Sequence, residues 1–187
     1  SAFNRYFLRH LFNLGLFACS FICEKPKQNR LNLFKKMKET IAVWFSCGAA
    51  SAVAAKKTIE KYGSTHNVIV VNNPVVNEHE DNLRFLADCE EWFGQKVISA
   101  INSNYPSCDI RDVFEKRKYI SGVLGAPCTK QLKKEARYQF EKNNKIDWHV
   151  LGFTVDEKKR SDKFIKFERK NLLPILIDAN LTKGNCF

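Results

Sequence analysis

The stretch IAVWFSCGAASAVAAK, residues 41–56, decides the fold of this chain. Residues 41–45 form a short apolar run of β-branched and aromatic side chains, which predicts a buried strand. The alanine-rich residues that follow Ser51 favour a helix. The chain must therefore turn sharply at residues 46–51, and the stretch predicts a strand, a tight turn and a helix in direct succession.

The turn at residues 46–51 has the features of an anion site. Gly48 permits backbone angles that are closed to other residues and lets a ligand approach the main chain. The first amides of the following helix lack internal partners and lie at the positive end of the helix dipole. Ser46 and Ser51 add hydroxyl donors, and no Gly-Lys-Ser/Thr follows, so this is not a Walker A loop. An ordinary strand-to-helix connection with a serine cap is the other interpretation.

The rest of the chain alternates between strand and helix patterns. Alternation of this kind indicates parallel strands joined by right-handed crossovers, and hence a three-layer α/β/α fold with a mainly parallel sheet. Ligands of such sheets bind outside the carboxyl ends of the strands. The predicted strands cover 41–45, 67–72, 96–101 and 148–151, with an irregular edge strand at 172–177, and the predicted helices cover 49–62, 78–93, 109–119, 127–143 and 156–169.

Length and charge limit the function classes. The 187 residues suit one domain, and 31 basic against 20 acidic residues give a net charge of +11. Residues 1–40 carry +6 of that charge, so the remainder is only moderately basic. A phosphate-rich small molecule accounts for that balance, and a nucleic-acid partner is left open. The seven cysteines are odd in number and irregularly spaced, which favours reduced thiols in the cytoplasm.

The N-terminal segment differs from the rest of the chain. Residues 11–23 are largely apolar but too few to span a bilayer, so no membrane partner is expected. The only methionine, Met37, precedes the first predicted strand by four residues. We therefore expect residues 1–36 to be a poorly ordered leader or upstream extension and residues 37–187 to be the domain.

The turn also resembles a known motif. Residues 46–51, SCGAAS, are similar to the SGGxDS signature (PP-loop) of ATP pyrophosphatases and of the phosphoadenosine phosphosulfate (PAPS) reductase family. Cys47 replaces a glycine of that pattern, and Ala50 replaces its aspartate. In ATP pyrophosphatases this carboxylate helps to manage the metal and the leaving pyrophosphate, so its replacement favours the PAPS reductase branch.

Three later segments extend the resemblance in the family's order. They are Asn72-Asn73-Pro74 with the helix start at 78–86, the cysteine-plus-basic segment 125–133, and the strand, glycine turn and charged helix at 150–160. The resemblance implies an adenine nucleotide alpha-hydrolase-like fold, which is Rossmann-like and of the HUP type. Family members continue into a C-terminal segment that often carries redox cysteines, so we expect this chain to be truncated there.

The resemblance further implies a function and a site. The expected reaction is thiol-dependent reduction of a sulfated nucleotide to sulfite and adenosine bisphosphate, with a thioredoxin or glutaredoxin-like reductant as partner. The nucleotide ligand is PAPS or ATP. The residues expected to bind it are Ser46, Cys47, Gly48, Ala49, Ala50, Ser51, Asn72, Asn73, Lys133, Gly152 and Arg160.

Cys128 is the expected catalytic cysteine. It precedes a predicted helix and three lysines, and both the helix dipole and the cations lower a thiol pKa; a buried core cysteine is the alternative. In iron–sulfur relatives, cysteines near this position bind a cluster together with the C-terminal segment, so a cluster is expected only with that segment, and no metal site is predicted in this chain. The basic runs are either phosphate ligands or solvated helix faces: Lys133, Lys134, Arg137, Lys158, Lys159, Arg160 and Lys163.

Two other functions compete with PAPS reduction. One is an ATP-dependent PP-loop sulfurtransferase or nucleic-acid modification enzyme, which would activate its substrate by adenylation. The other is a non-catalytic module that senses or sequesters adenylyl nucleotides. Release of pyrophosphate from ATP would favour the first of these, and release of sulfite from PAPS would exclude the second.

Overall fold

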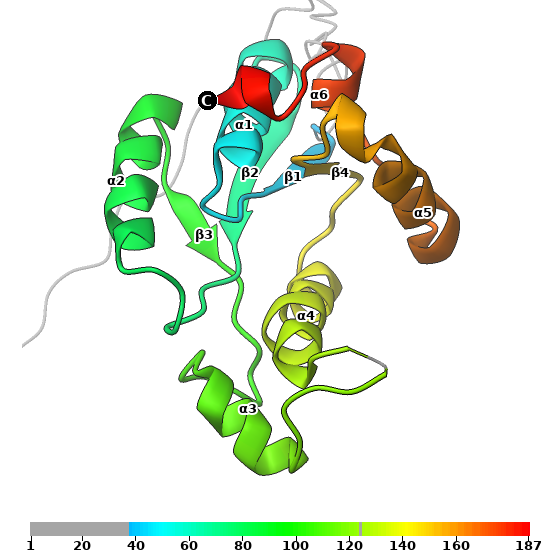
Figure 1. Cartoon of the computed structure of the whole chain (residues 1–187). Coiled ribbons are helices and arrows are strands. Elements are labelled where there is room, and N and C mark those ends of the chain that lie inside the picture. Colours follow the sequence, from blue (N-terminus) through cyan, green and yellow to red (C-terminus); the bar gives the residue numbers. More distant parts are fainter. Residues whose placement is uncertain (1–37, 124) are drawn as a thin grey trace, which may run out of the picture. The chain divides into compact units, whose positions relative to one another are not determined.

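Residues 38–123 and 125–187 are described by the computed structural model of the chain (Figure 1). The four strands in this part pair in parallel, in the order β3-β2-β1-β4. They are β1 (Thr40–Trp44), β2 (Asn67–Asn72), β3 (Val97–Ser99) and β4 (Trp148–Leu151). The predicted α/β fold with a parallel sheet is therefore confirmed, whereas the predicted leader at residues 1–36 lies outside the described residues.

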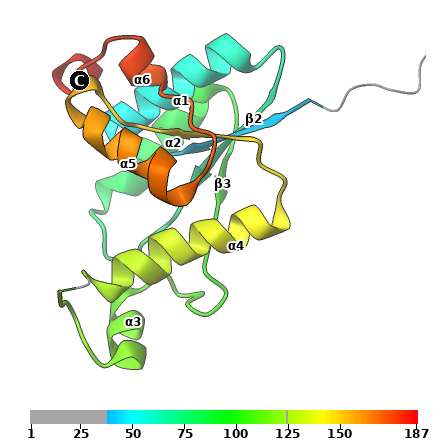
Figure 2. The ribbon, with the colours of Figure 1, turned by 90° about the vertical axis from the view of Figure 1, so that its right-hand side faces the viewer.

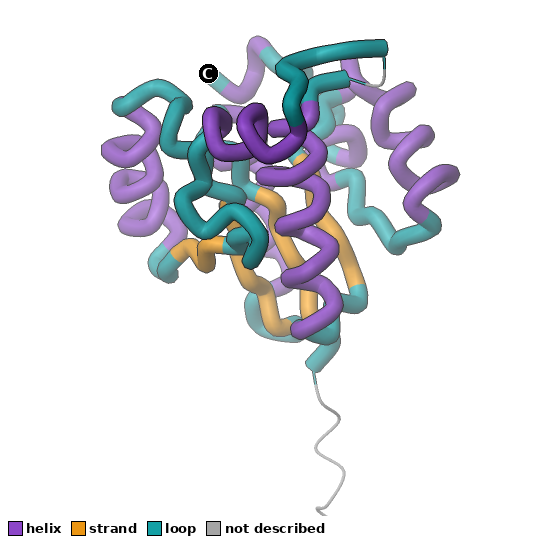
Figure 3. Tube along the Cα trace, turned by 90° about the horizontal axis from the view of Figure 1, so that it is seen from below, coloured by secondary structure: helices purple, strands orange, loops and turns teal. Residues whose placement is uncertain are grey.

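Helices cover both faces of this sheet. The α-helices are α1 (Ala49–Tyr62), α2 (Asp81–Phe93), α3 (Ile110–Arg117), α4 (Ala136–Asn143), α5 (Lys158–Glu168) and α6 (Ile175–Asp178). A π-helical segment, η1 (Thr129–Glu135), precedes α4, and η2 (Val155–Glu157) and η3 (Gly184–Cys186) are 3-10 turns. Helices α1, α2 and α6 lie on one side, and α4 runs along the strands on the other (Figures 2 and 3).

The central strand β1 is covered on both faces, which explains why its residues are almost all apolar. Ile41 and Val43 belong to the core beneath α1, whereas Ala42 and Trp44 belong to the core on the α4 side, where Phe140 packs against them. A parallel strand covered on both faces buries every side chain, so its sequence reads as a continuous apolar run. The first core is completed by the small buried alanines of α1, which let this helix lie close to the sheet.

Several predicted boundaries differ from the structure. The helix predicted from residue 78 begins at Asp81, because residues 78–80 form a turn in which His79 Nδ1 accepts the Asp81 amide at 3.1 Å. The strand predicted at 172–177 is wrong. Leu172 makes a single parallel bridge to His149, and the chain then enters α6, since Pro174 has no amide hydrogen to continue the pairing.

Candidate functional site

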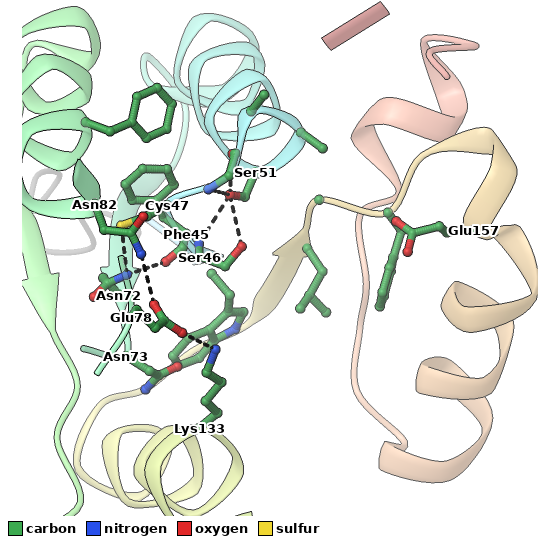
Figure 4. A pocket seen from close by; sticks show the side chains of 18 of the residues that line it. Phe45, Ser46, Cys47, Ser51, Asn72, Asn73, Glu78, Asn82, Lys133 and Glu157 are labelled. Atoms are coloured by element: carbon green, nitrogen blue, oxygen red, sulfur yellow. Dashed lines mark hydrogen bonds and ion pairs between the residues drawn. The ribbon is translucent and has the colours of Figure 1, made fainter. Parts of the chain in front are cut away.

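The loop between β1 and α1 is organised around one hydroxyl group. Ser51 Oγ donates to the Gly48 carbonyl at 2.8 Å and accepts from the Ser46 and Gly48 amides at 3.2 and 3.3 Å. Ser46 Oγ lies 3.3 Å from it. The first backbone hydrogen bond of α1 is Ala52 N–H to the Gly48 carbonyl, so the amides just before it have no acceptor within the helix. The loop thus presents amides and hydroxyls at the positive end of α1 (Figure 4).

The left-handed residue of this loop is Cys47, with φ of 53°, and not Gly48, which is extended at φ −119°. The expectation that Gly48 takes an angle closed to other residues is therefore wrong. The strained position falls on the first glycine of the SGGxDS pattern, which this chain replaces with cysteine. A non-glycine residue in this region costs about 1–2 kcal/mol.

Asparagines at the end of β2 fasten the loop to the sheet. Asn72 Nδ2 donates to the Phe45 carbonyl at 2.8 Å and lies 3.5 Å from Cys47 Sγ. The neighbouring Asn73 Nδ2 donates to the Ala100 carbonyl at 3.0 Å and so holds the end of β2 to the residue after β3. Both side-chain amides thus donate to the protein, and the Asn72 amide is the one that holds the loop.

Gly152, at the end of β4, packs directly against the start of α1. A Cβ at this position would lie 2.8 Å from the Ser51 nitrogen and 2.9 Å from its Cα. Contacts this short with backbone atoms force a shift, so only glycine allows the end of β4 to approach the start of α1. The sequence singled out Gly152, and the structure gives the packing reason.

These elements surround a cavity of about 840 Å³. All eleven residues that the sequence predicts for nucleotide binding line it, from the loop 46–51 to Asn72, Asn73, Lys133, Gly152 and Arg160. Figure 4 shows the loop and Asn82 on one side of this space and Glu157 on the other. The remaining lining residues are Trp44, Phe45, Glu78, Asp81, Asn82, Phe85, Lys134, Arg137, Leu151, Phe153, Glu157, Lys183 and Phe187.

The charged groups of the cavity are partly paired. Lys133 Nζ lies 2.6 Å from Glu78 Oε1, and Arg160 pairs with Glu157. Lys134 and Lys183 also line the cavity, and neither has a carboxylate partner among residues 38–123 and 125–187. Five cations and three carboxylates line the cavity in all, so its charge favours an anionic ligand.

Arg137 connects the cavity to a buried charge cluster that the sequence did not reveal. Its guanidinium pairs with Glu168 and lies 3.5 Å from Glu141, while Lys170 pairs with Glu141. His149, 4% exposed, lies beside these groups. Burial first, and then the charges of Lys170 and Arg137, lower the pKa of His149 to about 4. Arg137 and Glu141 are spaced i, i+4 on α4, whereas Glu168, Lys170 and His149 come from other parts of the chain, and no sequence spacing relates them to this pair.

Trp44 fixes the tautomer of this histidine. The Trp44 indole Nε1 donates to His149 Nδ1 at 3.1 Å, and the two rings stack with an interplanar angle of 10°. The acceptor role of Nδ1 requires the neutral ring to carry its proton on Nε2. A neutral histidine at this place supports the cavity wall, which Trp44 lines.

The cysteines occupy different environments. Cys47 lines the cavity, and burial, together with the nearby Glu78 carboxylate, raises the pKa of its thiol to about 11. Cys128, the expected catalytic residue, is not among the cavity-lining residues and packs instead against the cluster of Tyr105, Val113 and Leu132. The structure therefore separates Cys128 from the predicted nucleotide-binding residues.

The described residues lack two further features, a metal-binding group and a membrane-spanning helix. Within residues 38–123 and 125–187, no three His, Cys, Asp or Glu side chains are grouped as a metal site requires. The five cysteines of this part are free thiols, and no three of them lie together as ligands of an iron–sulfur cluster would. No helix in the same part has the length and apolarity needed to cross a bilayer.

Comparison with known proteins identifies the fold. No family model and no curated protein match the sequence. The structure is similar to that of NcsA, a U34-tRNA thiolase from Methanococcus maripaludis determined with its 4Fe-4S cluster, with a TM-score of 0.54 and 15% identity. The match covers 81% of this chain and 58% of that one, so the chain spans less than two thirds of NcsA. This likeness shows an adenine nucleotide alpha-hydrolase-like fold.

A second solved structure is less similar. It is a predicted subunit of a tRNA methyltransferase from Methanocaldococcus jannaschii, with 14% identity and a TM-score of 0.41 over 74% of this chain and 68% of that one. The fold assignment does not depend on it. Neither likeness singles out the PAPS reductase family within this fold.

Proposed function

We propose that this chain binds an adenine nucleotide in the 840 Å³ cavity, with its phosphates at the start of α1, and that the nucleotide is ATP. One observation carries the proposal: the phosphate-type loop 46–51, the ends of β2 and β4, and the basic side chains of η1 and α5 all line the same cavity. In a parallel sheet this is the edge at which nucleotides bind. The amides at the start of α1, which have no acceptor within the helix, supply the donors for a phosphate. Lys134 and Lys183, which form no ion pair among the described residues, supply positive charge.

The placement of the thiols favours ATP over PAPS. Reduction of PAPS needs a thiolate that attacks the sulfate sulfur. Cys47 is the thiol among the cavity-lining residues, and its pKa of about 11 keeps it protonated and unreactive near neutral pH. Cys128 is not among those residues. The described part of the chain therefore brings no reactive thiol to the nucleotide.

The chemistry that best fits ATP is activation of an acceptor by adenylation. An acceptor oxygen would attack the α-phosphorus, and the bond to the β-phosphate oxygen would break as pyrophosphate leaves. Glu78, Asp81 and Glu157 also line the cavity, but they are not grouped as a metal site requires, and none replaces the aspartate that the loop lacks. The likeness to a tRNA thiolase supports a nucleic acid as the acceptor.

PAPS remains the second candidate because of Ala50. This residue lines the cavity with a methyl group where the SGGxDS pattern has a carboxylate. A sulfated nucleotide needs no cleavage between its α- and β-phosphates, so it does not require that carboxylate. A thiol from outside the described residues would have to complete this reaction.

Calorimetry with the full chain tests the proposal. ATP, PAPS and ADP are titrated into the wild type, into Lys134→Gln and into Lys130→Gln. Lys134 lines the cavity, whereas Lys130, exposed one helical turn earlier, does not. We expect ATP to bind, Lys134→Gln to weaken it roughly 3- to 10-fold at low salt, and Lys130→Gln to leave it unchanged. Absence of heat with all three nucleotides would refute a nucleotide site.

Product assays separate the two chemistries. Pyrophosphate released from ATP in the presence of RNA would support adenylation. Sulfite released from PAPS with reduced thioredoxin would instead support reduction and overturn the preference for ATP. Ser46→Ala, which removes an exposed loop hydroxyl, should lower whichever activity is found, because Ser46 Oγ lies 3.3 Å from Ser51 Oγ.

A further inference from the structure

Helix α5 carries a row of lysines on its solvent side. Ser161 and Phe164 are the residues that it buries. With about 3.6 residues per turn, Lys159, Lys163 and Lys166 follow one another at i, i+4 and i+7 on the opposite side. All three are exposed, and none forms an ion pair with a carboxylate in residues 38–123 and 125–187. The row is thus a line of three lysines without an ion-pair partner among the described residues, with the exposed Asp162 beside it on the helix.

An aromatic flank lies between this row and the cavity. Arg160, Lys163 and Phe167 are spaced i, i+3 and i+7, so they share one flank of α5. Arg160 lines the cavity, and its guanidinium lies 5.4 Å from the centre of the Phe153 ring. At the far end, Phe167 is 74% exposed, with Lys166 Nζ 5.9 Å from its ring centre. Positive charge and an exposed aromatic ring therefore run from the cavity along the helix.

We propose that the face of α5 formed by Lys159, Lys163, Lys166 and Phe167 binds a single-stranded nucleic acid and leads it to the cavity. Proteins hold single strands by combining lysines that follow the backbone with aromatic rings on which bases stack. The exposed ring of Phe167 favours a nucleic acid over a simple anion, because a base can stack on the ring and a simple anion cannot. The proposal deepens the proposed function and rests on it for the site of reaction, while binding of the strand itself does not require ATP.

The chain supplies a matched control on another helix. Lys57 and Lys61 are exposed lysines on α1 at the same i, i+4 spacing as Lys159 and Lys163, and neither lines the cavity. The double variant K57Q/K61Q therefore removes the same charge, in the same helical geometry, as K159Q/K163Q. Any difference in strand binding between these two double variants therefore reflects the position of the lysines and not the net charge of the protein.

Fluorescence anisotropy of the full chain with labelled oligouridylate and oligothymidylate tests the surface. Each lysine–phosphate contact contributes about −0.7 to the slope of log affinity against log salt for a single strand. We expect K159Q/K163Q to make this slope shallower by about 1.4 and to weaken binding roughly 10-fold at low salt. K57Q/K61Q should leave the slope unchanged. Tighter binding of one oligonucleotide would identify RNA or DNA as the source of the strand.

Phe167→Ala tests the stacking separately. It should weaken binding of oligouridylate at least about 5-fold and leave binding of an abasic strand unchanged. The proposal is wrong if the wild type binds neither oligonucleotide at low salt, or if the two lysine doubles lose affinity equally. ATP calorimetry distinguishes the strand-binding face from the ATP site. Normal ATP binding by K159Q/K163Q, together with loss of strand binding, supports both proposals. Absence of ATP binding by the wild type refutes only the proposed function.

Discussion

Gly152 and Ser51 approach each other so closely that a Cβ on Gly152 would lie 2.8 Å from the Ser51 nitrogen. This contact joins the end of β4 to the first turn of α1. Because Ser51 Oγ organises the whole loop through three hydrogen bonds, the position of Gly152 also sets the shape of the proposed phosphate site. The two halves of the cavity are therefore mechanically coupled at this point.

Gly152→Ala should consequently damage both stability and ligand binding. Overpacking against backbone costs about 1–3 kcal/mol, and the displaced loop should bind ATP less tightly. Urea unfolding and calorimetry measure the two effects. Gly122→Ala is the control, since a Cβ there meets nothing within 4 Å. An alanine at 152 that left both quantities at their wild-type values would show that the loop accommodates it.

The strain at Cys47 predicts an unusual order of stabilities. Glycine normally destabilises a position relative to alanine, because it loses more backbone entropy on folding. At φ of 53° the order should reverse, and Cys47→Gly should be more stable than Cys47→Ala by about 0.5–1 kcal/mol. Both variants lack the thiol, so their difference in urea unfolding isolates the backbone angle. An alanine variant of equal or greater stability would mean that the loop relaxes.

The sequence predicted the elements whose signals are local. The helix at 49–62 and the strands at 67–72 and 148–151 have the predicted bounds, because alanine-rich and β-branched runs favour one structure and Gly63 ends the first helix. The irregular strand at 172–177 was wrong, since its apolar residues pack equally well as α6 after Pro174. The loop residues were found by their motif and Arg137 by its basic run, whereas the pairing of Glu78 with Lys133 depends on tertiary packing that no spacing encodes.

Glu78→Gln should tighten nucleotide binding. In the structure the Glu78 carboxylate lies 2.6 Å from Lys133 Nζ and therefore neutralises a cation that lines the cavity. Both side chains are partly exposed, so the pair is weak, and releasing Lys133 should raise affinity for ADP by roughly 3- to 10-fold at low salt. Titration in the presence of EDTA excludes metal binding by the carboxylate.

The neighbouring carboxylate provides the control for Glu78. Glu80→Gln removes the same charge two residues away, at an exposed position that does not line the cavity, and should leave ADP affinity unchanged. Weaker binding by Glu78→Gln would contradict the prediction and indicate that Glu78 contacts the ligand directly. Equal effects of both variants would attribute the change to net charge alone.

The buried His149 predicts a specific dependence of stability on pH. Burial and the nearby cations Lys170 and Arg137 lower its pKa from 6.5 to about 4, so the folded state favours the neutral ring. Between pH 6.5 and pH 4, His149 is protonated in the unfolded chain but neutral in the folded chain. The free energy of unfolding therefore falls as the pH drops from 6.5 towards 4. Above pH 6.5 neither state is protonated, and this contribution is constant. The full effect is on the order of 3 kcal/mol.

His149→Asn should remove this dependence while keeping an acceptor for the Trp44 indole, which donates to His149 Nδ1 at 3.1 Å. Free energies of urea unfolding measured from pH 7 to pH 4.5 should fall more steeply for the wild type than for this variant. His79→Asn, at an exposed position, is the control and should follow the wild-type curve. Parallel curves for all three proteins would mean that His149 is protonated in the folded state, where the carboxylates of Glu141 and Glu168 would then hold its charge.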